Sequence, residues 1–137
     1  MAKTIEIVKV STTGDTIRYE LWDNTGLGLL KKQKVEAWVK FHNVECFGFS
    51  AKGLPESILV LPITLYLLPV TWFYGVELVV PSIDKRLYER LPQIYNSYSK
   101  IYGPFKEEWH GKVTAKTIVE NKIPEVDSIM LSFFRGY

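Results

Sequence analysis

The chain has 137 residues, enough for one domain with a hydrophobic core and too few for two domains of ordinary size. Apolar residues make up 47% and aromatic residues 14% of the sequence, which excludes an intrinsically disordered chain. The formal net charge of +2 gives no reason to expect a nucleic-acid partner. Cys46 is the only cysteine, so an internal disulfide is excluded and a reducing, cytoplasmic compartment is expected.

The N-terminal region is predicted to form β-structure. Thr4–Val10 is a predicted strand, and after a turn Thr16–Trp22 alternates apolar with polar residues, as a half-buried strand does. The two segments together predict a β-hairpin. Two further strands are expected at Gln33–Phe41 and, shorter, at Cys46–Phe49.

A long uncharged stretch, Ser57–Val76, follows the predicted strands. Its twenty residues would suffice to cross a bilayer as a helix. Against a membrane segment stand Pro62 and Pro69, and no cluster of lysine or arginine closely flanks either end. We therefore favour a buried core helix followed by a strand over a membrane-spanning helix.

Within that stretch the helix is expected over Ser57–Leu68, where the residues are apolar on all sides, and Pro69 is expected to end or kink it. Gly75–Val80 is predicted to be a buried strand. Two more strands are expected near the C-terminus, at Lys112–Glu120 and Ser128–Phe134.

A second helix has the clearest periodicity in the chain. Its apolar residues recur at steps of four and three, namely Leu87, Leu91, Ile94, Tyr98 and Ile101. Ser82 and Asp84 are candidate N-caps. Pro92 lies inside the pattern and predicts a kink or a split near Leu91, and Gly103-Pro104 is expected to end the helix.

These elements predict one domain over residues 1–137, with a hairpin region at 1–50 and a helix-strand-helix-strand region at 55–137. The fold class we expect is α+β, a mainly antiparallel sheet with two main helices packed on one face.

No motif for catalysis or for a cofactor is present in the sequence. Glu107-Glu108-Trp109-His110 lacks the second histidine of a metalloprotease, and Gly26-Leu27-Gly28 lacks the third glycine of a dinucleotide loop. One cysteine and two histidines are too few for the usual four ligands of a zinc site. We therefore expect no catalytic residue, no metal and no cofactor.

Aromatic residues offer a candidate binding site. Tyr88, Tyr95 and Tyr102 are spaced seven apart on the second predicted helix. The rings can simply cover the sheet, which we favour, or they can line a pocket for a small molecule or a nucleobase. The candidate pocket residues are Trp38, Trp72, Tyr88, Tyr95 and Trp109.

Four segments, in this order, resemble a known family: Pro55–Pro62, Leu68-Pro69-Val70, Glu77–Asp84 and Leu87–Leu91. They are similar to the leader domain of bacterial PP-loop ATP pyrophosphatases, which are related to queuosine-pathway and asparagine-synthase-type enzymes. In that family the leader precedes a strand and a loop of the form Ser-Gly-Gly-x-Asp-Ser. Val113–Val119 and Ile129–Phe134 match the approach to this loop.

The chain departs from the family where the loop would begin. Phe134 and Arg135 replace small residues, and the second glycine, the aspartate and the following helix are absent. Such a loop holds pyrophosphate with backbone N–H groups, so we expect no ATP-pyrophosphatase activity. The ending resembles a premature stop, a frameshift or a split gene.

The resemblance implies a non-catalytic accessory or remnant N-terminal domain of a PP-loop ATP-dependent enzyme, with a role in protein interaction. The expected partner is a second copy of the chain or a separate PP-loop subunit, and the candidate contact is the edge formed by Ile129, Leu131, Phe133 and Phe134. The alternative is a stand-alone module that binds a small molecule or nucleobase in the aromatic pocket.

Overall fold

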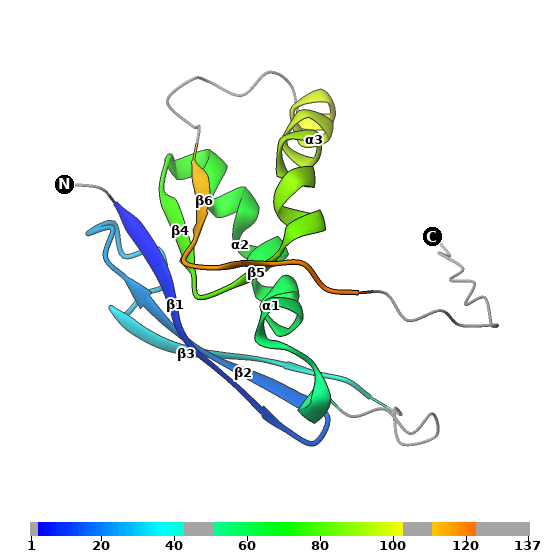
Figure 1. The fold of residues 1–137 in the computed structure, drawn as a ribbon. Coiled ribbons are helices and arrows are strands. Elements are labelled where there is room, and N and C mark those ends of the chain that lie inside the picture. The colour runs from blue at the N-terminus through cyan, green and yellow to red at the C-terminus, as the bar shows by residue number, and fades with distance from the viewer. Residues whose placement is uncertain (1–2, 43–50, 103–110, 123–137) are drawn as a thin grey trace.

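The structure is a computed structural model that describes residues 3–42, 51–102 and 111–122. A five-stranded sheet has the strand order β3-β2-β1-β4-β6, and helices gather on one side of it (Figure 1). Its strands are β1 (Thr4–Thr13), β2 (Thr16–Asp23), β3 (Lys34–Lys40), β4 (Glu77–Val80) and β6 (Lys112–Ala115). A two-stranded sheet pairs β5 (Ile83–Asp84) with β7 (Ile118–Val119) in parallel.

The main sheet joins a long antiparallel part to a short parallel part. β1 pairs with β2, and β2 with β3, in antiparallel ladders that run nearly the whole length of the strands. β1 pairs with β4, and β4 with β6, in parallel over three and four residue pairs. The predicted α+β class with a mainly antiparallel sheet is confirmed.

The helices of the described region are α1 (Glu56–Leu59), α2 (Leu61–Tyr74) and α3 (Lys85–Tyr102), with a short 3-10 turn, η2 (Ala51–Gly53), before α1. The two long helices, α2 and α3, are the two main helices that the sequence predicts. α2 contacts β4, and α3 contacts β5 and β7, so the helices occupy the side of the sheet where the core lies.

The predicted hairpin forms because its apolar residues alternate. In β1, Ile5 and Ile7 point to the core, and a register shift between Ile7 and Lys9 leaves Lys9 exposed beside the exposed Val8. Such a bulge changes the face on which the following residues lie. β2 keeps strict alternation, so that every second residue from Ile17 to Leu21 is buried.

The core forms between the sheet and the first two helices. Apolar side chains from the strands meet those of α1 and α2 in one cluster, whose main members are Ile5, Ile7, Ile17, Tyr19, Leu21, Leu78, Val80, Leu59, Ile63 and Leu67. Tyr19 is only 1% exposed, and its hydroxyl donates a hydrogen bond to the Leu59 carbonyl at the end of α1. Burial raises the pKa of Tyr19 to about 12, so the phenol stays protonated and keeps this bond.

The uncharged stretch forms more helix than the sequence predicts. α2 continues through Pro69 to Tyr74, and Gly75 ends it in the left-handed conformation, with φ of 61°. Glycine adopts this conformation without the steric cost of a Cβ atom. Of the two outcomes expected at Pro69, an end of the helix is wrong, and a kink stays a prediction. No helix of the described residues is both long and apolar enough to cross a membrane.

α3 is one helix from Lys85 to Tyr102 and contains Pro92. Of the two outcomes expected near Leu91, the split is therefore wrong, and the kink stays a prediction. The prediction that Asp84 caps the N-terminus of this helix is confirmed, because its carboxylate accepts hydrogen bonds from the backbone N–H groups of Arg86 and Leu87. Pro92 lies at the eighth position of the helix, where it removes one backbone donor and leaves the rest of the ladder in place.

The strand predicted at Lys112–Glu120 is wrong as a single element. β6 ends at Ala115 in the main sheet, and β7 begins at Ile118 in the small sheet, so the chain changes partners between them. The alternation of residues along one segment cannot show that the chain passes from one sheet to another. The strands predicted at Cys46–Phe49 and Ser128–Phe134 lie outside the described residues.

Candidate functional site

An open pocket of about 440 Å³ lies between α2, α3 and β6. α2 contributes Leu68 and Trp72, and α3 contributes Tyr88, Leu91 and Tyr95. β6 and the residue before it close the third side. The volume falls within the range usual for small-molecule sites in proteins.

Three of the five aromatic residues singled out in the sequence meet in this pocket: Trp72, Tyr88 and Tyr95. Trp38 lies on β3, at the far end of the strand order from β6, and its side chain is 64% exposed. It is therefore not part of this site. Trp109 lies outside the described residues.

Aromatic contacts fix the wall between the two long helices. The rings of Trp72 and Tyr95 meet edge to face with centroids 5.5 Å apart, and Tyr98 packs against Trp72 at 5.0 Å. Trp72 is only 4% exposed, because α3 covers it. Tyr88 is 37% exposed and lies one heptad before Tyr95, so both rings project from the same face of α3.

The pocket also has polar groups that the sequence did not single out. Asn96 lines it from α3, and Lys112 lines it from β6. Pro92 lines it too, and because proline has no N–H, it cannot donate the hydrogen bond that the Tyr88 carbonyl would receive in an uninterrupted helix. The pairing of β6 with β4 brings Lys112 beside α3, and no local pattern in the sequence announces that proximity.

Gly111 brings β6 close to the end of α2. A Cβ atom at this position would lie 2.1 Å from the Thr71 carbonyl oxygen and 2.4 Å from the Val76 carbonyl oxygen. Only a residue without a side chain allows this approach. Gly111 therefore sets how near the Lys112 side of the pocket lies to Trp72.

A second candidate surface is the side of α2 that faces away from the core. Its residues recur at helical spacing, and we call them the outward face of α2: Pro62, Leu65, Tyr66, Pro69 and Phe73. Leu65 is 44% exposed and Tyr66 is 78% exposed. The expectation that this helix is buried on all sides is wrong for the outward face, because the sheet covers only one side of it. The predicted interaction edge of Ile129, Leu131, Phe133 and Phe134 lies outside the described residues.

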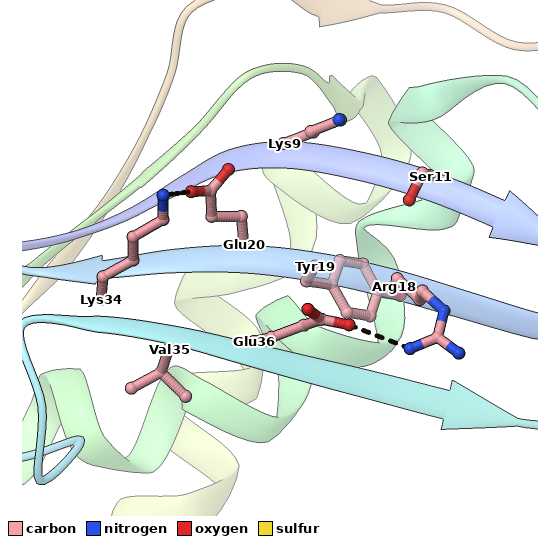
Figure 2. Close-up of a pocket in the computed structure, with 8 residues that line it drawn as sticks. All are labelled: Lys9, Ser11, Arg18, Tyr19, Glu20, Lys34, Val35 and Glu36. Carbon is pink, nitrogen blue, oxygen red and sulfur yellow. Dashed lines mark hydrogen bonds and ion pairs between the residues drawn. The ribbon is translucent and has the colours of Figure 1, made fainter.

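A third candidate is a hollow on the open face of the sheet, opposite the helices (Figure 2). Four of its charged side chains pair across strands, Arg18 with Glu36 at 2.9 Å and Lys34 with Glu20 at 2.6 Å, and Lys9 lines the hollow as well. The hydrogen bond from Lys34 lowers the pKa of Glu20. Since these four charges already form ion pairs, an ionic ligand in the hollow would have to compete with those pairs for its contacts.

Buried polar residues form a fourth cluster where α1, β5 and the residues after β7 meet. Asn121 donates hydrogen bonds to Asp84 at 2.8 Å and to Ser57 at 2.9 Å. The hydrogen bond from Asn121, with those from the α3 backbone, lowers the pKa of Asp84. These contacts satisfy one another and hold the start of α3, so the cluster has a structural role.

Among residues 3–42, 51–102 and 111–122, no group of three or more histidine, cysteine, aspartate or glutamate side chains is arranged to hold a metal ion. Comparison with protein-family models, with curated proteins and with solved structures finds no match. The two candidate sites that remain are the aromatic pocket and the outward face of α2.

Proposed function

We propose that this chain is a non-catalytic protein-interaction domain that pairs with a second copy of itself through the outward face of α2. The observation that carries the proposal is the exposure of this face. A helix that is apolar on all sides is normally buried on all sides, yet Tyr66 is 78% and Leu65 44% exposed. Contiguous exposed apolar surface of this kind marks interaction sites in soluble proteins.

The chemistry of the face favours a second copy as the partner. No charged residue occurs from Ser57 to Val76. When a helix packs on its own copy about a two-fold axis, the same patch lies on both sides of the contact, so any charge on it would be buried at a cost unless an opposite charge of that patch faced it. An uncharged face avoids this cost. The resemblance to PP-loop leader domains adds the proposal that the pair serves such an enzyme as an accessory domain.

The test is the mass of the full chain in solution over a series of protein concentrations, measured by sedimentation velocity. We expect the wild-type chain to form a dimer. Tyr66→Lys places a charge at the most exposed position of the face and should weaken the dimer by about tenfold or more. Because Tyr66 is 78% exposed, the variant is expected to fold.

Trp38→Lys is the matched control, since it makes the same kind of exchange at a 64% exposed aromatic residue on the open face of the sheet. It should leave the dimer intact. A wild-type chain that stays monomeric at every concentration would contradict the proposal. So would a dimer that Trp38→Lys disrupts as strongly as Tyr66→Lys.

A further inference from the structure

We propose that the pocket between α2, α3 and β6 binds a planar aromatic ring that carries a negatively charged group. This site is separate from the outward face of α2, which carries the proposed pairing. Its residues lie on the side of α2 that faces α3, and the docking residues Tyr66 and Phe73 do not line it.

The walls of the pocket suit a flat ring. Tyr88 and Tyr95 stand on one face of α3, and Trp72 closes the back of the pocket from α2. Aromatic walls attract an aromatic ring by stacking and by edge-to-face contact. The attraction for a saturated ring of the same size is weaker. Leu68, Leu91 and Val113 provide apolar surface between the rings.

One charge identifies the polar end of the ligand. Lys112 is the one charged residue among the described residues that line the pocket, and within the described part of the chain it makes no ion pair. An ammonium group at the rim of an apolar pocket favours an anion such as a carboxylate or phosphate. The Asn96 amide, on the α3 side, supplies both a donor and an acceptor for further polar atoms.

The hollow on the open face gives a contrast. It has the same volume of about 440 Å³, but Arg18 pairs with Glu36 and Lys34 with Glu20 there, and Lys9 lines it as well. Both sites therefore hold a cation. The hollow has one aromatic lining residue, Tyr19, which is only 1% exposed, whereas the aromatic pocket combines its cation with several rings and apolar surface. The geometry therefore points to the aromatic pocket.

The experiment uses three probes that differ in one property each: 2-naphthoate, its neutral analogue 2-naphthamide, and the saturated decalin carboxylate. Each is titrated into the full chain, and binding is followed by the NMR signal of the Trp72 indole N–H. We expect 2-naphthoate to bind about fivefold or more tightly than either analogue, because only naphthoate has both the planar ring and the charge.

Variants then test whether Lys112 is the residue that recognises the negative charge of the probe. Lys112→Met keeps the apolar stem and should remove the preference for naphthoate over naphthamide, while Lys100→Met, at an exposed position of α3 outside the pocket, should preserve it. Tyr88→Ala, at a 37% exposed ring, should weaken all binding of aromatic probes about threefold or more.

Three results would overturn the inference. The first is equal affinity for naphthoate and naphthamide, and the second is equal affinity for naphthoate and the decalin carboxylate, both measured on the unmodified chain. The third is probe-induced signal changes confined to Leu65 and Tyr66, which would place the probe on the outward face of α2. None of these results depends on whether the chain forms dimers.

Discussion

The open face of the main sheet and the helical layer on its other side expose different kinds of side chain to water. On the open face, charged side chains from neighbouring strands pair with one another, as Arg18 does with Glu36 and Lys34 with Glu20. On the helical side, α2 covers the sheet with one apolar face and presents a second apolar face, with Tyr66 78% exposed. Figure 1 shows that the helices lie on one side of the sheet.

The two faces therefore differ in whether they would gain free energy by binding a partner. Cross-strand ion pairs are compatible with solvent and need no partner. An uncharged helix face gains free energy when it leaves water, by roughly 25 cal/mol for each Å² of apolar area buried. For this reason we propose that the interaction surface and the ligand site lie on the helical side, in the outward face of α2 and in the pocket beside it.

Substitution of one leucine on each side of α2 tests the contrast most strongly. Leu67 is 2% exposed and packs in the core, so Leu67→Ala should lower the free energy of unfolding by about 3 kcal/mol. Leu65→Ala, on the outward face and 44% exposed, should lower the stability of the monomer by less than about 1 kcal/mol. Urea unfolding at low protein concentration measures both. Equal losses would mean that the two faces of α2 are equally packed.

Gly111→Ala tests the close approach of β6 to α2. The added Cβ atom would meet two backbone carbonyl oxygens, which cannot rotate away, so we expect a loss of about 2 kcal/mol in the free energy of unfolding. Gly53→Ala is the control, because a Cβ atom there would have nothing within 4 Å. If thermal unfolding shows the same small change for both variants, the packing of Gly111 is not as tight as the structure indicates.

Asp84 should make the free energy of unfolding depend on pH. Its pKa is lowered in the folded state, so its carboxylate contributes stability above the ordinary pKa of aspartate, and this is lost as the pH falls through the folded pKa. Asp84→Ala should cost about 1 kcal/mol at neutral pH through loss of the α3 cap. The difference from wild type should shrink in acid. A difference that stays constant from neutral pH to below the folded pKa would show that the charge of Asp84 plays no part.

The open face should show the smallest effect. Arg18 and Glu36 form an exposed pair, with side chains 49% and 61% exposed, so their coupling in a double-mutant cycle with alanine should be about 0.5 kcal/mol or less. Added salt should reduce it further. A coupling well above this value would mean that the open face contributes to stability as much as the helical layer does.

Local patterns predicted the elements that one segment can specify. The alternation in Thr16–Trp22 predicted β2 to within one residue, and the steps of four and three from Leu87 predicted α3 with its Asp84 cap. Two predictions based on prolines were wrong, namely the end of a helix at Pro69 and the split of a helix near Pro92. In both helices the surrounding turns hold the conformation, so the loss of one backbone donor does not end the element.

The aromatic pocket was predictable only in part. The sequence named Trp72, Tyr88 and Tyr95 as pocket residues, and the structure brings these three together between α2 and α3. Lys112, Asn96 and Gly111 gave no signal in the sequence, since their role depends on where β6 lies. Trp38 carries the same side chain as Trp72, and nothing local distinguishes a tryptophan on the open face from one between two helices.

The sequence by itself determined the hairpin, the long amphipathic helix and the uncharged character of α2, because each follows from the spacing of residues within one segment. Only the tertiary structure decided which face of α2 is covered, since a helix that is apolar all round carries no pattern to choose a side. It also decided that β6 pairs with β4 beside α3, which brings Lys112 to the rim of an aromatic pocket. Pairings between distant strands depend on the whole chain, and no local window of residues contains them.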